Sequence, residues 1–368
     1  MGPKEDPPDR LDRYRSMRDF GRTPEPSGAD DTPDAERWED GETGGRFVVQ
    51  EHHATALHWD LRLERHGTLA SWAVPKGIPP DPRTDHLAIH TEDHPLLYLD
   101  FEGQIPEGEY GAGKMTVWDR GTYECEKWSD REVMFTLHGQ RAKGRHVLFR
   151  TGAKQWMLHR MDPPEDPTRE PMPADVRPLI IPSGPLPGDQ RAWSFEAAWG
   201  GTRVAVASEG GRVRVLDEHG GDLTDQFPEL PALGRALGAV AVVLEGELVV
   251  TGADGRPDPH ALTHRARARA RAKSENALRR LADRSPAGFL AGDVVWLEGH
   301  PTTSLPYRQR RTLLDRLQLD GPSWRTAPSH PGDGAVLLEA TRAQGLPGIV
   351  ARHLDGVYDA EHVRFVPA

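Results

Sequence analysis

The segment from Arg46 to Glu64, RFVVQEHHATALHWDLRLE, constrains the fold more than any other part of the chain. In its second half apolar and polar side chains alternate, which is typical of a β-strand because side chains two positions apart point to the same face. One predicted face is wholly apolar and can enter a core, and the other is wholly polar: Trp59, Leu61 and Leu63 against His58, Asp60 and Arg62. A strand with such a polar face lines either solvent or a site.

The polar face carries residue types suited to a metal–phosphate site. We expect His52, on the preceding segment, to fold over the same face as His58 and Asp60. Two imidazoles and one carboxylate leave coordination positions open on a divalent cation, as a catalytic site requires. Arg62 offers a planar fork for two phosphate oxygens beside that metal. Imidazole and oxygen ligands suit manganese and zinc alike, so the residues alone do not choose between them.

A single histidine in a strand usually has a structural or surface role, and this chain has 17 histidines. The joint pattern favours a site, because residues of compatible chemistry follow soon after. Lys76 lies in a Val-Pro-Lys-Gly turn, and His94 and Tyr98 follow an apolar run, Leu87 to Ile89, that predicts a strand. The glycine-rich segment 102–113 precedes another alternating run and is therefore predicted to connect two strands of a hairpin.

Composition divides the chain into four parts. Residues 1–44 are polar and predict a mostly disordered arm with one short helix around Leu11 to Asp19. Residues 45–162 hold short alternating segments between glycine turns, which indicates a mainly β domain, an antiparallel β-barrel. Residues 163–190 are rich in proline and predict a linker. Residues 191–368 predict an α+β domain, with strands at 203–208, 212–216 and 240–250 and helices at 274–282 and 307–317.

Charge and composition narrow the class of protein further. The net charge of −11 argues against a protein that coats nucleic acid through a broad basic field. The basic run 265–273 remains either a DNA contact or a solvated surface segment. Cys125 is the one cysteine, and no apolar run is long enough for a signal region or a membrane helix. We therefore expect a cytoplasmic, nucleoid-associated protein that makes no use of a membrane.

Residues Leu11 to Asp162 resemble the 3′-phosphoesterase module of bacterial DNA ligase D, through the motifs FVVQ-x-H, LH-x-D-x-RLE, SWAVPKG, EDHPL-x-Y, FEG-x-IP-x-G-x-YGAG and VWDRG. The resemblance implies a manganese-dependent enzyme, with another divalent metal as the alternative. Such an enzyme removes a 3′-terminal ribonucleoside and then the 3′-phosphate, leaving a 3′-hydroxyl. It also implies a role for each site residue. His52, His58 and Asp60 would bind the metal, Arg62 and His94 would contact the scissile phosphate, and Lys76 and Tyr98 would support them.

The same resemblance extends to an arm that precedes the barrel. It implies that Arg18, Asp19 and Glu25 act in the ribonucleoside step. One position departs from the family, because His86 stands where an arginine is common. This departure predicts either a weakened phosphate contact, which would affect one of the two steps, or a contact supplied by Arg83, three residues earlier.

Residues from Trp193 to about Tyr358 resemble the adenylation domain of ATP-dependent DNA ligases, a nucleotidyltransferase-like (ATP-grasp-like) fold, through WSFE, LEGELV and GIVAR. Ala198 stands where that family has its lysine nucleophile, and Gly200 where it has an aspartate. A methyl group cannot attack an α-phosphate, so no covalent enzyme–AMP is expected and no ATP requirement follows. Pro347 and Arg352 replace a family glutamate and lysine. We expect a degenerate domain retained as a scaffold, DNA clamp or partner surface.

The sequence hypothesis is a metal-dependent phosphoesterase that heals DNA 3′ ends in double-strand-break repair, joined to a ligation-inactive domain. Its partners would be DNA 3′ ends at a primer-template or break, together with an end-joining polymerase, a ligase and Ku. The alternative is a non-catalytic protein that bridges DNA ends or repair partners. A third hypothesis, an active ligase, is disfavoured by Ala198.

Overall fold

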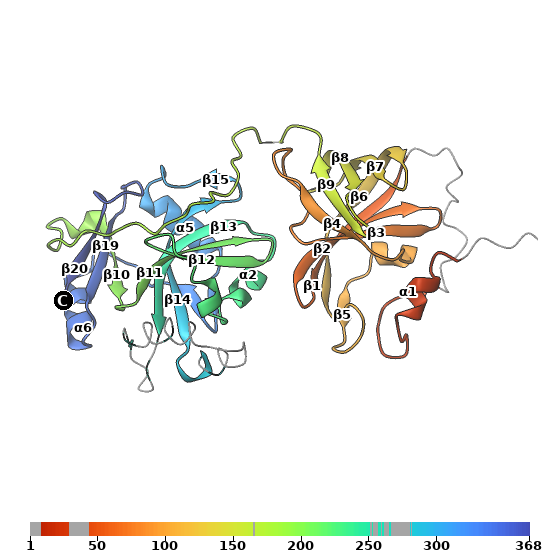
Figure 1. The fold of residues 1–368 in the computed structure, drawn as a ribbon. Coiled ribbons are helices and arrows are strands. Elements are labelled where there is room, and N and C mark those ends of the chain that lie inside the picture. The colour runs from red at the N-terminus through yellow and green to blue at the C-terminus, as the bar shows by residue number, and fades with distance from the viewer. Residues whose placement is uncertain are drawn as a thin grey trace, which may run out of the picture. The chain divides into compact units, whose positions relative to one another are not determined.

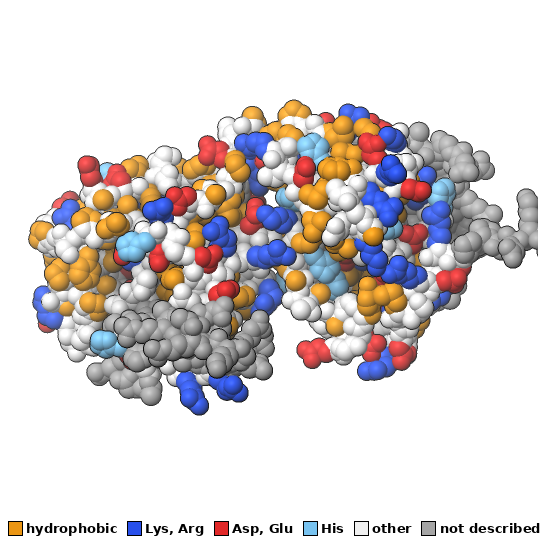
Figure 2. Space-filling model, viewed as in Figure 1, with side chains coloured by type: hydrophobic (Ala, Val, Ile, Leu, Met, Phe, Trp, Pro, Cys, Tyr) orange, Lys and Arg blue, Asp and Glu red, His pale blue; other side chains and the backbone are white. Residues whose placement is uncertain are grey.

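The computed structural model describes residues 9–28, 44–164, 166–250, 252, 257–258, 260, 265, 280 and 282–368. The chain forms two compact units, Met1–Pro167 and Thr168–Ala368. On the face shown in Figure 2, acidic and basic side chains lie among one another in both units. None of the helices that the structure describes is both long and apolar enough to cross a membrane.

The first unit contains a closed antiparallel barrel of eight strands within its described residues, which confirms the predicted fold class (Figure 1). The ring runs in the order β1 (Gly44–His53), β2 (Leu57–Arg65), β3 (Thr68–Val74), β4 (His86–His90), β9 (Gln155–Arg160), β8 (Lys143–Arg150), β7 (Glu132–His138) and β6 (Gly113–Trp128). The long strand β6 pairs with β1 and thereby closes the ring. The short β5 (Gly103–Ile105) pairs with β6, so the glycine-rich segment connects two strands of a hairpin as predicted.

The alternation predicted for β2 is present. Trp59, Leu61 and Leu63 lie in the barrel's interior core, to which all eight strands contribute. On the opposite face Asp60 and Arg62 are buried, at 5% and 2% exposure, and His58 is partly exposed. The outer surface near these strands is covered by a second apolar cluster, which joins residues of β1, β3 and β6 to the N-terminal arm and to the 3-10 helix η1 (Leu96–Leu99).

The arm is ordered from residue 9 to residue 28. Its helix α1 (Asp12–Ser16) is five residues long and buries Tyr14, whose hydroxyl donates to the carbonyl of Pro26 at 2.6 Å. Leu11 is buried beside it. The expectation of a mostly disordered arm therefore does not hold for this stretch, and the rest of the predicted arm, 1–8 and 29–43, lies outside the described residues.

The second unit is an α+β domain, as predicted. One sheet has the order β18 (His330–Pro331), β10 (Trp193–Ala198), β19 (Gly348–His353) and β20 (Val363–Pro367). The other has the order β12 (Arg212–Asp217), β11 (Thr202–Glu209), β13 (Val242–Val250), β14 (Ala287–Leu297), β17 (Trp324–Thr326) and β16 (Asp320–Gly321), with β15 (His300–Pro301) also paired to β14. Helices α2 (Pro231–Leu237) and α5 (Tyr307–Arg316) add leucines to the core of this sheet, and α6 (Gly334–Ala343) packs on the first. Short 3-10 turns are η2 (Gln190–Ala192) and η3 (Thr224–Gln226).

Much of the predicted linker 163–190 packs on the second unit. Val176 is buried in a cluster with residues of β11, β12, β13 and β14. Ser183 pairs with Phe365 of β20, and the amide of Gly184 donates to the Phe365 carbonyl at 2.9 Å. This part of the segment predicted as a linker is therefore not a free tether between the two units.

The basic run 265–273 begins with a buried residue. Arg265 is 2% exposed and donates to both carboxylate oxygens of Glu229, at 2.6 and 3.0 Å. Arg265 itself is held inside the domain and is not a surface contact for DNA. The remaining residues of the run, and nearly all of the helix predicted at 274–282, lie outside the described residues.

Candidate metal centre

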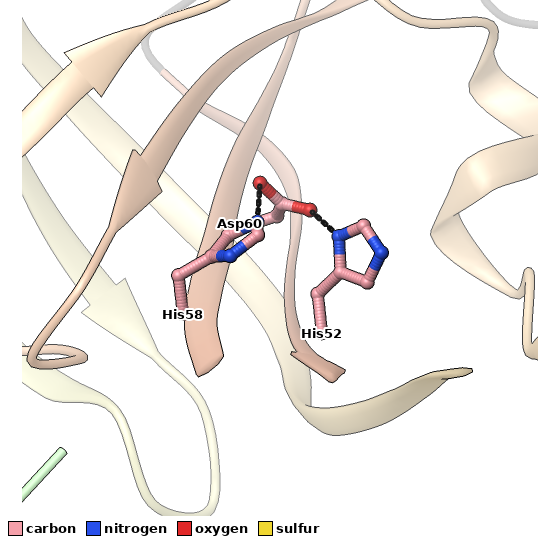
Figure 3. Close-up of side chains that lie close together, drawn as sticks. All are labelled: His52, His58 and Asp60. Atoms are coloured by element: carbon pink, nitrogen blue, oxygen red, sulfur yellow. Dashed lines mark ion pairs between the residues drawn. The ribbon is translucent and has the colours of Figure 1, made fainter. Parts of the chain in front are cut away.

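The hairpin of β1 and β2 brings two histidines and one aspartate together. His52 and His58 are direct cross-strand partners, and Asp60 follows two residues later on the same face of β2. His52 Nδ1 lies 3.5 Å from Asp60 Oδ2, and His58 Nε2 lies 3.7 Å from Asp60 Oδ1 (Figure 3). One ligand atom from each of the three residues lies within 4.8 Å of the other two. This spacing suits a single metal ion.

Backbone carbonyls fix which nitrogen of each imidazole carries the hydrogen. His52 Nε2 lies 2.9 Å from the Gly111 carbonyl, and His58 Nδ1 lies 3.0 Å from the Ala56 carbonyl. A carbonyl only accepts, so these two nitrogens donate. In a neutral ring the other nitrogen then has a free lone pair, and in both rings that nitrogen faces Asp60. Such outer hydrogen bonds are typical of metal-binding histidines, and the donor set fits a divalent cation.

Arg62 holds the carboxylate of Asp60. Its three nitrogens donate to Asp60 Oδ2 at 3.0 Å, to Gln50 Oε1 at 2.8 Å and to Ser71 Oγ at 2.9 Å. Burial opposes ionisation of Asp60, but the positive charge of Arg62 outweighs it and lowers the pKa of Asp60 below its usual range. Arg62 was expected to contact a phosphate. In the structure its guanidinium is instead 2% exposed and already donates to three protein groups. Arg62 therefore positions the carboxylate of Asp60, the candidate metal ligand.

A second charged group links the arm to the barrel. Arg18 donates to Glu25 Oε1 at 2.7 Å and to Glu92 Oε1 at 3.2 Å, and its side chain is 4% exposed. Glu25 also accepts from the hydroxyl of Tyr98 and, at 2.7 Å, from Thr23. The Tyr98 ring in turn lies 4.9 Å from the Arg62 guanidinium. Tyr98 therefore connects the Arg18 cluster to the face of β2 that carries Asp60 and Arg62.

His94 belongs to the second group as a neutral base. Its Nδ1 donates to the Glu92 carbonyl at 2.9 Å, and its Nε2 accepts from Arg18 Nη2 at 3.3 Å. Burial and the neighbouring charges of Arg62 and Arg18 lower its pKa well below the usual value. A neutral His94 can orient Arg18 without adding a further positive charge.

Two predicted site residues, Asp19 and Lys76, are exposed. Asp19 is exposed, and its carboxylate accepts from the amide of Gly21 at 3.0 Å. Lys76 is exposed in the turn after β3, at the end of the barrel where His58 lies, because the register pairs Trp59 with Val74.

The unusual His86 is buried at the start of β4 and donates from Nδ1 to the Gly77 carbonyl at 2.7 Å. Arg83 donates to Asp81, with its Nη2 at 3.0 Å from Oδ2. Its bond to Asp81 does not support the expectation that Arg83 replaces the missing arginine.

Sequence reasoning missed four residues that hold the site: Gln50, Ser71, Glu92 and Thr23. Gln50 lies two positions before His52 on β1, and a bulge occurs between Val49 and Gln50 where β1 pairs with β6. Bulges are frequent next to active sites. Gln50 and Glu92 each precede a predicted site histidine by two positions. In an extended strand, side chains at this spacing lie on the same face, so the spacing was the sequence signal that could have identified them.

In the second unit, the position expected for a nucleophile is apolar. Ala198 is 7% exposed and packs with Val350 and Val363. Leu179 and Ile181, from the segment predicted as a linker, pack against the same cluster. Nearby charges are buried against each other. Arg352 lies 3.6 Å from Glu196 and 3.3 Å from Asp293, and Tyr307 donates to Glu196 at 2.7 Å.

The structure is thus a β-barrel with a candidate metal site, joined to a nucleotidyltransferase-type domain. Residues 50–150 match the family model of the DNA ligase D 3′-phosphoesterase domain, and residues 186–364 match that of the ATP dependent DNA ligase domain. The N-terminal domain thus matches the first of these families, and the C-terminal domain matches the second.

Several known proteins are similar over nearly the whole chain. The multifunctional non-homologous end joining DNA repair protein LigD of Mycobacterium tuberculosis is 40% identical over 355 residues, 95% of this chain and 44% of the relative. LigD of Pseudomonas aeruginosa is 33% identical over 402 residues, 95% of this chain and 45% of the relative. The chain thus spans less than half the length of these relatives. A solved structure of mycobacterial DNA ligase D complexed with ATP and MES matches with a TM-score of 0.45 and 27% identity, over 53% of this chain and 62% of that one.

Proposed function

We propose that the N-terminal domain is a metal-dependent phosphoesterase that heals DNA 3′ ends during non-homologous end joining. It would remove a 3′-terminal ribonucleoside and then the 3′-phosphate, leaving a 3′-hydroxyl. The observation that carries this proposal is the arrangement of two imidazoles, those of His52 and His58, around the carboxylate of Asp60. In each ring one nitrogen donates to a backbone carbonyl, so the other nitrogen keeps a lone pair and faces the carboxylate. The match to the 3′-phosphoesterase domain family supports the same reaction class.

Each residue group has a distinct task in the proposed reaction. A bound divalent cation, which we propose to be Mn²⁺, would withdraw charge from the phosphate oxygens. Arg62 keeps Asp60 ionised for that ion. Arg18, held by Glu25, Glu92 and His94, is the buried cation on the arm side of the site and is proposed to keep the arm in place for the ribonucleoside step. Lys76 and Asp19, both exposed, are proposed to contact the DNA end.

The test uses the full chain, Mn²⁺ and a primer-template that ends in a 3′-phosphate or a single 3′-ribonucleotide. We expect trimming to a 3′-hydroxyl by the wild type and its loss in His58→Ala. A matched control is His53→Ala, because His53 neighbours the same group but pairs with Glu51 at 2.7 Å. Equal trimming by wild type and His58→Ala would refute the assignment. Normal DNA binding without turnover in any divalent metal would favour a non-catalytic end-bridging protein.

We also propose that the C-terminal domain cannot ligate and needs no ATP. This proposal is supported by the methyl group of Ala198 inside an apolar cluster and by the contacts of Arg352 with Glu196 and Asp293. Incubation with labelled ATP and Mg²⁺ should give no protein–AMP adduct, and nicked DNA should remain unsealed. A covalent adduct would reverse the proposal. A separate ligase, an end-joining polymerase and Ku are then the proposed partners, at breaks in the cytoplasmic nucleoid.

A further inference from the structure

One exposed aromatic ring lies beside the proposed site and has no role in holding it together. Six large apolar side chains are exposed among the residues that the structure describes, and Tyr110, 47% exposed, is the only aromatic one. It belongs to the loop 106–112 between β5 and β6. An exposed aromatic ring next to a site for a nucleic-acid end offers a surface on which a nucleobase can stack.

The loop holds Tyr110 between the metal-binding group and the arm. On one side, the carbonyl of Gly111 accepts from His52 Nε2 at 2.9 Å. On the other, Glu109 forms an ion pair with Arg22 at 3.1 Å. The ring itself lies 5.3 Å from the guanidinium of Arg18, which contacts the Tyr14 ring at 3.9 Å. Tyr110 is thus fixed at both neighbouring residues while much of its ring stays exposed.

The electrostatics of the ring agree with this placement. Partial burial and the nearby charge of Glu92 raise the pKa of Tyr110, so the phenol is neutral at physiological pH. A neutral ring polarised by the Arg18 cation can approach a DNA end without repulsion from the phosphate.

We propose that Tyr110 is a substrate-positioning residue that stacks on the open face of the 3′-terminal nucleobase, an inference that rests on the proposed phosphoesterase function. The last base of a primer strand has one unstacked face, so stacking there costs no unpairing. The contact does not depend on base identity, because every nucleobase has a π-face. It would place the terminal nucleotide so that its phosphate reaches the metal group.

The test compares Tyr110→Ala with Tyr110→Phe on two 3′-phosphate primers, one with a terminal base and one with a terminal abasic sugar. Tyr110→Ala should raise KM on the first by roughly 5- to 100-fold, as expected for one lost base–aromatic contact. It should leave KM on the abasic primer and kcat on both nearly unchanged, and Tyr110→Phe should behave as wild type. Leu97→Ala removes a side chain of similar exposure, 49%, and is the control for lost apolar surface.

A binding measurement without metal supplies a second readout. A terminal 2-aminopurine should be quenched on binding to the wild type and to Tyr110→Phe, but much less on binding to Tyr110→Ala. If Tyr110→Ala raises KM equally on both primers, or quenches as the wild type does, stacking is rejected while the phosphoesterase activity stands. If the wild type trims neither primer, it is the proposed function that fails.

Discussion

Replacing Arg62 should reveal how strongly the stability of the N-terminal domain depends on one buried guanidinium beside the carboxylate of Asp60. Arg62→Met leaves the Asp60 carboxylate, which is 5% exposed, without its counter-ion. Breaking a buried ion pair in this way costs about 3–5 kcal/mol of folding stability. In an Asp60→Asn background no charge is stranded, and we expect the same replacement to cost about 1–2 kcal/mol, from the lost bonds to Gln50 and Ser71. The coupling between the two positions is then about 2–3 kcal/mol.

The assay is urea unfolding of the four full-length proteins without metal, read by hydrogen exchange in peptides from β1 to β3. Because β1 to β3 belong to the N-terminal domain, amide hydrogen exchange in these strands reports the unfolding of that domain alone. Adding Mn²⁺ should restore part of the stability lost in Arg62→Met, because the ion would lie against the same carboxylate. A coupling below about 0.5 kcal/mol, the level seen for independent sites, would refute the argument that Arg62 compensates the charge of Asp60.

Three further predictions test separate parts of the structure. Arg18→Met strands the carboxylates of Glu25 and Glu92 and should destabilise the arm by about 3–5 kcal/mol, seen as faster proteolysis within residues 9–28, whereas Arg22→Met, at an exposed ion pair, should cost less than about 1 kcal/mol. Burial lowers the pKa of His146 to about 4. Between pH 6.5 and about 4 the unfolded chain therefore binds a proton at His146 that the folded chain does not bind. About 3 kcal/mol of the free energy of unfolding, present above pH 6.5, should be lost as the pH falls to about 4. Urea midpoints across this range should fall less steeply in His146→Gln. Ala198→Lys puts an ammonium into an apolar cluster; it should lower stability by at least about 2 kcal/mol and give no AMP adduct with labelled ATP.

The local pattern of the sequence was enough to predict the barrel and its key strand. Alternation in β2 separates Trp59 from Asp60 on opposite faces, and both are buried as a two-sided strand requires. The proximity of His52 to His58 followed from a short hairpin, since a tight connection places neighbouring strands in register. Absence of a lysine at Ala198 is likewise a property of the sequence alone.

The tertiary structure alone decided which groups those residues contact. Arg18 contacts Glu92 and His94, which lie 74 and 76 positions away, and no local pattern reveals such pairs. The same holds for Arg62, whose fork was expected to face phosphate but donates to three protein groups. Side-chain alternation fixes the face that a residue occupies. What covers that face depends on distant segments, here the arm and η1, and burial then forces each charge to find a partner inside the protein.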